Sequence, residues 1–253
     1  MPRRKQSRYT AAEDCPLLIQ SGKDFFTSCK GRWREEYFHN NNPIVLELAC
    51  GRGEYTVWLS QVYPDKNFIG VDIKAERMMV GIQSYKSQVI SCKWYGEWEN
   101  LTLNTHNLAL PKVAFLRTII HHIDQFFAPG EVDEIWIVHP DPRPKNRDIK
   151  RRLTSPRFLA MYYSLLSDGG LLRLKTDDGD LFSYSVEEIE GMRDWKNPAA
   201  NDGTGERMRE LVAKTDDLYN SPLLAEHHGI RTHYETMFVE QGRTIHYGVW
   251  KKV

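Results

Sequence analysis

The sequence predicts an α/β protein with a mostly parallel sheet and helices on both of its faces. Short apolar runs rich in branched residues alternate with longer helical stretches along most of the 253 residues. Turn-forming residues separate the runs from the stretches, and no segment repeats. Hydrophobic residues make up 41% of the chain and charged residues 27%, so length and composition suit one large core.

Five strands and five connecting helices are expected from residue 43 onward. The strands, each a short apolar run between turn residues, are placed at 43–48, 67–72, 112–117, 132–139 and 170–176. The helices are placed at 53–63, 75–90, 118–127, 155–166 and 179–190. Ser167-Asp-Gly-Gly170 is expected to end the fourth helix and to start the fifth strand, since glycine commonly follows a helix.

Three segments have less regular patterns. Residues 91–111 contain two tryptophans and a tyrosine without a clean period, and they either extend a helix or form an excursion. Residues 191–222 are expected as a long loop with one short helix, of the kind that often covers a site. In the tail, Gln241-Gly242 lies between two strand-like runs and predicts an antiparallel hairpin at the sheet edge.

Residues 1–42 are expected to form a basic N-terminal extension with a leading helix, and residues 43–253 a single domain. The chain has 34 Lys and Arg against 34 Asp and Glu, so attraction to a polyanion must come from a local patch. Its four cysteines form no CxxC pair and have no histidine at ligand spacing, so we expect reduced thiols in the cytoplasm and no metal. We also expect no membrane segment and no signal peptide, because no apolar run is long enough.

A strand that ends in a glycine turn is the most informative motif of the chain. The run from Ile44 continues through Glu47-Leu-Ala-Cys-Gly-Arg-Gly53, and a second apolar run ends in Asp72. Glycine lets the backbone approach a ligand closely, and an acidic residue 19 positions after Gly53 can accept hydrogen bonds from ribose hydroxyls. The motif predicts a nucleoside-cofactor site made by Glu47, Gly51, Gly53 and Asp72. The alternative is a helix-capping turn with a surface aspartate.

S-adenosylmethionine fits this motif better than a dinucleotide. The dinucleotide fingerprint has a third glycine three positions after Gly53, where this chain has Thr56. Glu47 lies within the strand, which is a costly place for a carboxylate unless it accepts hydrogen bonds. S-adenosylmethionine carries no phosphate, and its sulfonium and ammonium groups favour acidic surroundings. We therefore expect it as the cofactor.

A basic segment follows the fourth strand. His139-Pro-Asp-Pro-Arg-Pro144 places three prolines around Asp141 and so stiffens the chain there. Ligands in open α/β sheets bind beyond the carboxyl ends of strands, where Glu47 and Asp72 are also expected. The cations of the segment are Arg143, Lys145, Arg147, Lys150, Arg151 and Arg152. They predict a polyanionic substrate whose phosphates are bound locally, with a solvated loop as the alternative.

Taken in order, these motifs resemble those of the bacterial tRNA (guanine-N7-)-methyltransferases, from about residue 43 onward. The resemblance rests on Glu47-Leu-Ala-Cys-Gly-Arg-Gly53, Pro140-Asp-Pro-Arg-Pro-Lys145, Lys150-Arg-Arg-Leu153, Leu174-Lys-Thr-Asp177, Thr232-His-Tyr-Glu235 and Glu240-Gln-Gly242. It implies a Rossmann-like methyltransferase fold with a seven-stranded, mostly parallel sheet and a C-terminal antiparallel hairpin. It also implies an enzyme that methylates N7 of a guanine in tRNA, and we expect a monomer or homodimer.

The resemblance implies roles for individual residues. Those implied for the cofactor are Glu47, Asp72, Asp141 and, at the end of the third strand, Arg117 or Thr118. Those implied for the guanine are Lys145, Asp177, Thr232, Tyr234 and Glu235. This chain departs from the family with His139 where Phe is usual, Arg143 where an aromatic residue is usual, and Asp148 in place of a histidine. The planar guanidinium of Arg143 can still stack on a base.

The chemistry of guanine N7 suggests a catalytic role for Asp141. N7 has a free lone pair and no proton, so it attacks a sulfonium methyl group without a general base. The purine gains positive charge, and Asp141, Asp177 and Glu235 can accept the strengthened hydrogen bonds from its edge. Two structural alternatives stay open, namely Asp177 as a helix N-cap and residues 232–235 as a strand start. The functional alternatives are methylation of an exocyclic amine and a non-catalytic RNA-binding partner protein.

Overall fold

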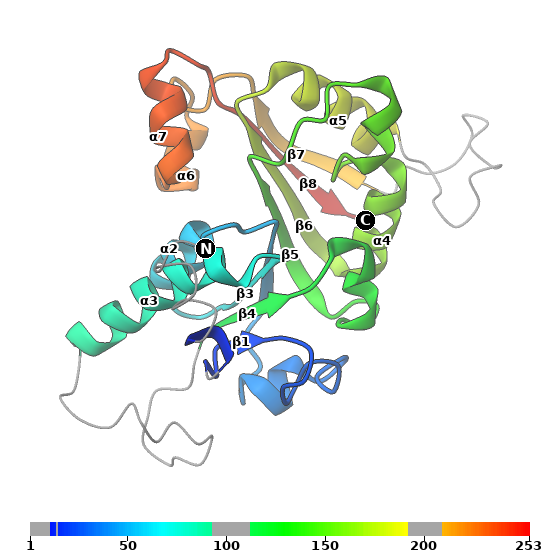
Figure 1. Cartoon of the computed structure of the whole chain (residues 1–253). Helices are drawn as coiled ribbons and strands as arrows, with labels where there is room; N and C mark the ends of the chain where they lie inside the picture. Colours follow the sequence, from blue (N-terminus) through cyan, green and yellow to red (C-terminus); the bar gives the residue numbers. More distant parts are fainter. Residues whose placement is uncertain (1–10, 14, 93–111, 192–208) are drawn as a thin grey trace. The chain divides into compact units, whose positions relative to one another are not determined.

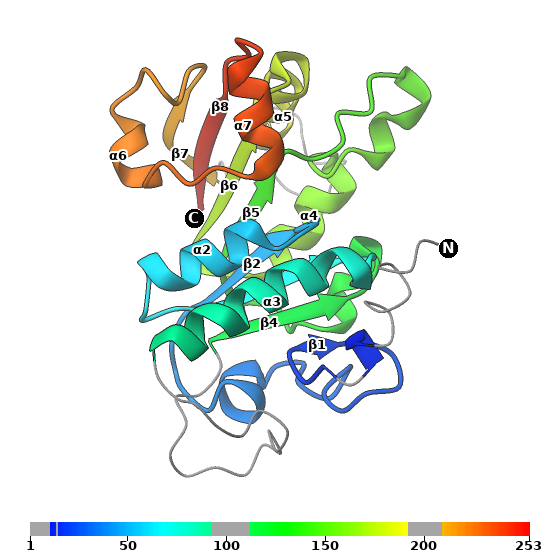
Figure 2. The same cartoon turned by 60° about the vertical axis from the view of Figure 1, so that its left-hand side comes forward.

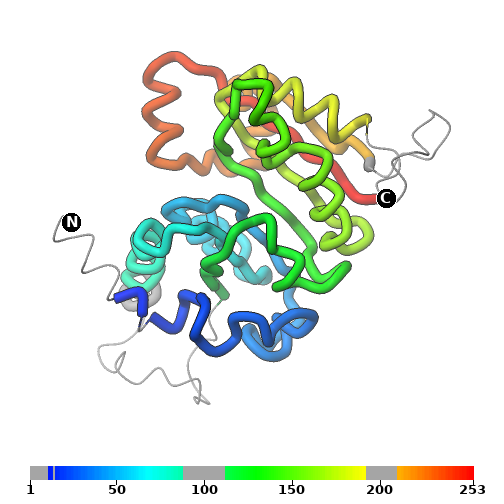
Figure 3. The backbone as a smooth tube through the Cα atoms, turned by 45° about the vertical axis from the view of Figure 1, so that its right-hand side comes forward, coloured from blue at the N-terminus to red at the C-terminus, as the bar shows by residue number. Residues whose placement is uncertain are grey.

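The described part of the chain falls into two compact units. The computed structural model describes residues 11–13, 15–92, 112–191 and 209–253. The first unit is Met1–Phe126 and the second is Phe127–Val253, and each holds four of the eight described strands. Figure 1 labels the elements, and the trace in Figure 3 follows the chain from blue in the first unit to red in the second.

Four parallel strands form the framework of the first unit. They are β1 (Leu18–Ile19), β2 (Ile44–Leu48), β3 (Asn67–Asp72) and β4 (Val113–Arg117), in the order β1-β4-β3-β2. The helices are α2 (Glu54–Val62), α3 (Ala75–Cys92), the π-helical η1 (Trp33–Tyr37) and the 3-10 helix η2 (Ile120–Gln125). In Figure 2, α2 and α3 lie side by side over β3 and β4, against which they pack.

Burial explains why these short runs are strands. All of β2 and every residue of β3 except Asp72 are buried, as expected where helices or loops cover both faces of a parallel sheet. Glu47 is the acidic exception inside β2. Glu47 pairs in register with Gly70, and Asp72 pairs with Arg117, so the carboxyl ends of the three strands meet at one edge.

The second unit combines parallel and antiparallel strands. They are β5 (Val132–Val138), β6 (Leu166–Thr176), β7 (Arg209–Thr215) and β8 (His246–Lys252), in the order β5-β6-β8-β7. The helices are η3 (Asn146–Arg151), α4 (Pro156–Leu165), α5 (Gly179–Gly191), α6 (Leu223–His227) and α7 (His233–Glu240). β5 and β6 are parallel, whereas β8 runs antiparallel to both β6 and β7.

Helices cover both faces of these four strands. Side chains alternate along a strand, so Lys175 and Leu172 of β6 point to opposite faces. Lys175 contacts Glu235 on α7. Trp250, which is the β8 partner of Leu172 and shares its face, donates to Glu190 on α5. Consequently α7 and α5 lie on opposite sides of the sheet, as Figure 1 shows.

The expected alternation of five strands and five helices is confirmed, with boundaries shifted by a few residues. The third connection is only the short η2, and β6 already begins at Leu166. The glycines at 169 and 170 therefore lie inside β6, where its pairing with β5 is irregular. A Cβ atom at Gly170 would lie 2.8 Å from the carbonyl oxygen of Ser167, so this irregular strand requires glycine. The two-residue β1 adds an eighth strand to the seven expected.

The predicted hairpin of the tail is wrong in its first strand. His233–Glu240 is α7, because Thr232 and Glu235 form a capping box that starts a helix. The antiparallel partner of β8 is β7, which lies in the segment expected to be a loop. The C-terminal antiparallel pair exists, but the chain builds it from strands that are separated by α6 and α7.

Several expectations fall on residues that are not described. α3 extends to Cys92, and residues 93–111 of the aromatic segment lie outside the described ranges. The same holds for residues 192–208 of the expected loop and for residues 1–10 of the N-terminal extension. The domain division at residue 43 stays a prediction. No helix among the described residues is long and apolar enough to cross a membrane.

Candidate active site

Candidate residues gather at the carboxyl ends of strands within each of the two units. The first unit holds Glu47, Gly51, Gly53, Asp72, Arg117 and Thr118 at the ends of β2, β3 and β4. The second holds Asp141 and the basic segment after β5, Asp177 after β6, and residues 232–235 at the start of α7. The expected carboxylates of each unit are thus found at strand or helix ends.

Glu47 is buried in β2, and its hydrogen-bond donors come from α2. Its Oε2 accepts a hydrogen bond from the backbone N–H of Thr56 at 2.7 Å and another from the Thr56 hydroxyl at 2.5 Å. Thr56 lies in the first turn of α2, where backbone N–H groups have no partner within the helix. Burial raises the pKa of Glu47 to about 8, although the bonds from Thr56 act to lower it. The carboxyl group is therefore protonated near pH 7 until a cation approaches it.

Asp72 joins the glycine turn to the segment after β3. Its Oδ2 accepts from the backbone N–H of Gly51 at 3.0 Å, and its Oδ1 accepts from the backbone N–H of Lys74 at 2.9 Å. These two bonds orient the carboxylate, while each oxygen keeps a second lone pair for a further donor. The arrangement suits a pair of ribose hydroxyls.

The glycine turn leaves open backbone beside these carboxyl groups. Gly51 and Gly53 have φ of 55° and 68°, in the left-handed region that favours glycine. A Cβ atom at Gly51 would meet nothing closer than 4.0 Å, whereas one at Gly53 would lie 2.3 Å from the ring of Phe115. Gly53 is thus required for packing, whereas the space where a side chain of residue 51 would begin is open. Open backbone with acidic groups nearby fits S-adenosylmethionine, which carries cationic groups and ribose hydroxyls.

The end of β4 places Arg117 and Thr118 beside β3. The backbone N–H of Thr118 donates to the carbonyl of Asp72 at 3.1 Å. Arg117 is exposed, and its Nε donates to the carbonyl of Ile73 while Nη1 donates to the side chain of Gln20, both at 3.2 Å. Both residues adjoin the acidic strand end, and their contact with the cofactor stays a prediction.

Asp141 in the second unit is an exposed carboxylate that its own loop orients. Its side chain is 63% exposed and forms an ion pair with Arg143, from Oδ2 to Nε at 3.0 Å. The backbone N–H of Arg143 also donates to Oδ1 at 3.4 Å. Arg143 has a positive φ of 47°. The carboxylate is therefore directed by the loop and accessible to a ligand.

Most cations of the basic segment are accessible to phosphates. The exposed ones are Lys145, Arg147, Lys150 and Arg151, on η3 or next to it. Asp148 lies 3.9 Å from Arg147 and 3.1 Å from Arg151, and exposed pairs of this kind contribute little stability. Phosphate binding by these four side chains stays a prediction that their exposure supports.

Arg152 has a different environment from the other five cations. It is buried, its Nε donates to the carbonyl of Pro142 at 3.1 Å, and its guanidinium lies 4.4 Å above the ring of Tyr184. Its Nη2 also donates to the carbonyl of Arg143 at 3.3 Å. Burial counts against the phosphate contact expected for Arg152. Its contacts instead hold the loop that carries Asp141.

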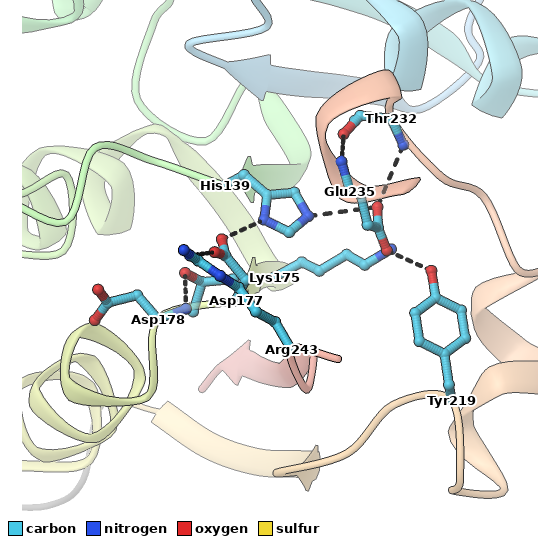
Figure 4. Close-up of polar contacts among 9 residues, drawn as sticks. His139, Lys175, Asp177, Asp178, Tyr219, Thr232, Glu235 and Arg243 are labelled. Carbon is cyan, nitrogen blue, oxygen red and sulfur yellow. Dashed lines mark hydrogen bonds and ion pairs between the residues drawn. The ribbon is translucent and has the colours of Figure 1, made fainter. Parts of the chain in front are cut away.

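A cluster of charged side chains joins β5 and β6 to α7 (Figure 4). Lys175 and Glu235 are fully buried, with Nζ 2.5 Å from Oε1. His139 lies between two carboxylates, with Nδ1 3.0 Å from Asp177 Oδ1 and Nε2 3.4 Å from Glu235 Oε2. Arg243 binds the other oxygen of Asp177, from Nη1 to Oδ2 at 2.7 Å. Asp177 and Glu235, both expected at the guanine, therefore belong to one network.

Glu235 has hydrogen-bond donors or cations at both oxygens. The Tyr219 hydroxyl donates to Oε1 at 2.5 Å, and the backbone N–H of Thr232 donates to Oε2 at 3.3 Å. Burial alone would raise the pKa of Glu235, but His139 and Lys175 outweigh it and lower the pKa to about 2. Burial lowers the pKa of Lys175 to about 8, against the attraction of Glu235. Glu235 is thus an anion throughout the neutral range.

The two structural alternatives for these residues are both wrong. Asp177 is not an N-cap, because its neighbour Asp178 accepts the bond from the backbone N–H of Leu181 at 2.7 Å. Residues 232–235 begin a helix rather than a strand. Tyr234 is 48% exposed on α7, whereas Glu235 is buried, so a guanine would reach Glu235 only by replacing its present partners.

Several members of these clusters were not expected from the sequence. They are Thr56, Lys175, Tyr219 and Arg243. Lys175 has a recognisable signal, because a lysine inside an apolar strand requires an anionic partner. Tyr219 and Arg243 have no such signal in the sequence, because only the tertiary fold brings them to Glu235 and Asp177.

Comparisons with known proteins agree with the methyltransferase family and fold expected from the sequence. A family model described as "Putative methyltransferase" matches residues 41–247. The tRNA (guanine-N(7)-)-methyltransferase of Cytophaga hutchinsonii is 38% identical over 247 residues, which cover 98% of this chain and 96% of that protein. Its namesake in Porphyromonas gingivalis is 43% identical and covers 92% of this chain and 80% of its own. That of Clostridium perfringens is 31% identical over 99% of both chains.

Among solved structures, the 16S rRNA methyltransferase KamB is similar in fold. The match covers 88% of this chain and 91% of that chain, with a TM-score of 0.53 and 16% sequence identity. This likeness concerns the fold alone, and the methyltransferase fold expected from the sequence is confirmed. Within the described ranges, no group of three or more His, Cys, Asp or Glu side chains could hold a metal ion.

Proposed function

This chain belongs to the family of tRNA (guanine-N7-)-methyltransferases, and from that membership we infer that it transfers a methyl group from S-adenosylmethionine to N7 of a guanine in tRNA. The observation that carries the inference is the likeness to curated relatives along nearly the whole chain. The exposed Asp141 and the exposed cations beside it support the same activity.

We propose that the first unit binds the cofactor. Asp72 would accept hydrogen bonds from the ribose hydroxyls, and the open backbone at Gly51 would allow the close approach. Glu47 would ionise when a cationic group of the ligand comes near, which offsets the cost of its burial. Arg117 and Thr118 would border the same ligand. S-adenosylmethionine, when bound, supplies an electrophilic methyl group.

The second unit would bind the tRNA. Phosphates would contact the exposed cations Lys145, Arg147, Lys150 and Arg151. Arg143 and Tyr234 present a guanidinium plane and an aromatic ring on which a base can stack. Asp177 would bind the guanine edge, with Thr232 and Glu235 supporting it from α7.

The mechanism needs no general base, because guanine N7 has a lone pair and no proton. Asp141 would orient the base and stabilise the positive charge that develops on the purine. Holding the reacting atoms in line contributes up to about 7–11 kcal/mol in favourable cases. The protein's main tasks are therefore positioning and charge stabilisation.

The reaction is tested directly with purified protein, labelled S-adenosylmethionine and tRNA. Digestion of the methylated tRNA should yield 7-methylguanosine from one position of the tRNA. In a strain that lacks the protein, tRNA should carry an unmethylated guanine at that position. A methylated exocyclic amine would instead support a base-amine methyltransferase. Tight tRNA binding with no methyl transfer would support a non-catalytic RNA-binding protein.

The role of Asp141 is tested by Asp141→Asn. We expect the single-turnover methylation rate to fall by about a hundredfold, as when a preorganised electrostatic partner is lost, while tRNA affinity changes little. Asp168→Asn is a matched control, because Asp168 is a fully exposed carboxylate within β6. Near wild-type turnover in Asp141→Asn would exclude a catalytic role for Asp141 and would mean that it only structures its loop.

The basic segment is tested by the salt dependence of tRNA binding. Neutralising Lys145 and Arg147 should weaken binding and flatten the slope of log K against log salt by about 0.7–0.9 for each phosphate that the protein no longer neutralises. Affinity for S-adenosylmethionine should stay the same. An unchanged slope would mean that these side chains are only solvated.

A monomeric or dimeric state and a cytoplasmic location also remain proposals. Gel filtration with light scattering would test the first, and cell fractionation would test the second.

A further inference from the structure

His139 lies at the junction between β5 and the loop that carries Asp141. Its backbone N–H donates to the carbonyl of Lys175 on β6 at 2.8 Å, and its φ is 44°. A positive φ is strained for a residue with a side chain, so surrounding contacts must hold this conformation. The side chain is only 10% exposed. The surroundings therefore hold both the strained backbone and the buried side chain of His139 in place.

Each carboxylate that faces His139 already binds a cation through its other oxygen. Arg243 binds Asp177 Oδ2, and Lys175 binds Glu235 Oε1. His139 faces the remaining oxygen of each, Asp177 Oδ1 with Nδ1 and Glu235 Oε2 with Nε2 (Figure 4). The distance from Nε2 to Glu235 Oε2 is that of an ion pair, but the two atoms are not aligned as in a hydrogen bond. The imidazole thus bridges two anions from two different elements.

The donor pattern of imidazole decides which protonation state fits this bridge. A neutral ring has one N–H and one lone pair, so either tautomer would direct a lone pair at a carboxylate oxygen. The imidazolium has an N–H on both nitrogens and matches both anions. Burial lowers the pKa of His139, as does the charge of Lys175, but Asp177 and Glu235 prevail and raise the pKa above its ordinary value.

We propose that His139, as an imidazolium, is a positioning residue that ties Asp177 and Glu235 to the loop carrying Asp141 and so holds the guanine-binding side chains in register. The inference deepens the proposed function and rests on it for the identity of the substrate. His139 acts through these carboxylates and through the backbone that leads to Asp141. It takes no proton from the guanine.

The bridge predicts a pH dependence opposite to that of a histidine base. The imidazolium exists below the raised pKa of His139, so kcat/KM for tRNA should be highest there and fall as the pH rises through that pKa. A histidine base would instead lose activity as the pH falls. Lys175 also titrates near pH 8, so the wild-type profile must be compared with that of a variant that lacks His139.

The test uses His139→Phe, which keeps an aromatic ring at this position but has no ring N–H. We expect kcat/KM for tRNA at pH 6.5 to fall about tenfold, mainly through KM, with unchanged affinity for S-adenosylmethionine. The fall of wild-type kcat/KM that accompanies loss of the imidazolium should be absent from this variant. His39→Phe is the matched control, because His39 has a similar φ of 50° but is exposed. Its values should equal those of wild type.

A second measurement on the unmodified chain keeps the proposal testable even if His139→Phe does not fold. Ring-nitrogen NMR of histidine-labelled protein should show His139 mostly protonated on both nitrogens at pH 6.5, because its pKa is raised above the ordinary value. A neutral ring at pH 6.5, or wild-type kcat/KM in His139→Phe, would overturn the proposal. If the wild type methylates no tRNA, the proposed function fails separately. Equal tRNA affinity of wild type and His139→Phe would then overturn the role of His139.

Discussion

Glu47 in the first unit and Glu235 in the second are both buried glutamates, yet their surroundings drive their pKa values in opposite directions. Glu47 is 5% exposed and Glu235 is 0% exposed. Burial dominates at Glu47 and raises its pKa to about 8. At Glu235 the effect of burial is outweighed, and the pKa is lowered to about 2. Burial alone therefore does not decide the charge of a carboxyl group.

The difference comes from the partners. Glu47 accepts hydrogen bonds from the neutral N–H and hydroxyl groups of Thr56, whereas Glu235 faces the cations Lys175 and His139. The second unit supplies its own counterions and so maintains a charged site in the absence of ligand. Glu47 forms no ion pair within the described part of the chain, and the cationic cofactor proposed for the first unit would supply the missing charge. Four substitutions can break or sharpen this contrast.

The largest effect is expected for Lys175→Met. This change leaves Glu235 buried without its closest cation, and breaking a buried pair in this way costs about 3–5 kcal/mol. Urea unfolding at pH 7 measures the loss. Lys214→Met is the matched control, because its pair with Glu190 is exposed and should contribute less than about 1 kcal/mol. Adding Glu235→Gln to Lys175→Met should recover part of the lost stability. If Lys175→Met lost no more stability than Lys214→Met, the contrast between Glu47 and Glu235 would be refuted.

The next effect concerns Glu47→Gln and the pH dependence of stability. Between about pH 4.5 and 8 the folded chain keeps a proton on Glu47 that the unfolded chain releases, so stability falls as the pH rises. The contribution is at most about 1.4 kcal/mol per pH unit, and Glu47→Gln should remove it. Urea unfolding from pH 5 to 8 compares the two proteins.

Glu235 provides the opposite case for the same experiment. Its lowered pKa adds stability that is present above about pH 4.5 and is lost as the pH falls toward 2. Glu235→Gln should therefore remove the loss of stability between about pH 4.5 and 2. Equal slopes for wild type and Glu47→Gln between pH 5 and 8 would mean that Glu47 is already ionised.

The smallest effect is expected for Thr56→Val, which removes the hydroxyl donor of Glu47 but keeps the backbone N–H. The lost hydrogen bond should cost about 1 kcal/mol in urea unfolding and should raise the pKa of Glu47 further. Ser60→Ala is the control, since the Ser60 hydroxyl in the same helix donates to the carbonyl of Val57 at 2.7 Å and not to Glu47. Only Thr56→Val should weaken binding of S-adenosylmethionine, as calorimetry can show.

The sequence alone was sufficient for the fold class, the order of the main strands and helices, and the position of the glycine turn. These depend on local patterns, because a buried strand requires an apolar run and a tight turn beside a ligand requires glycine. Glu47, Asp72 and Asp141 could be named as candidate site residues for the same reason. Their order along the chain also carried the family resemblance, which the comparisons confirm.

The tertiary structure decided the charge states and the partners. The run that forms α7 has a strand-like pattern in the sequence, and β7 lies in a stretch that is rich in turn residues. Whether a carboxyl group is ionised depends on atoms within a few ångströms of it, and those atoms come from distant parts of the chain. Lys175 and His139 lie 60 and 96 residues before Glu235 in the sequence, and only the packing of α7 on β6 makes them its counterions.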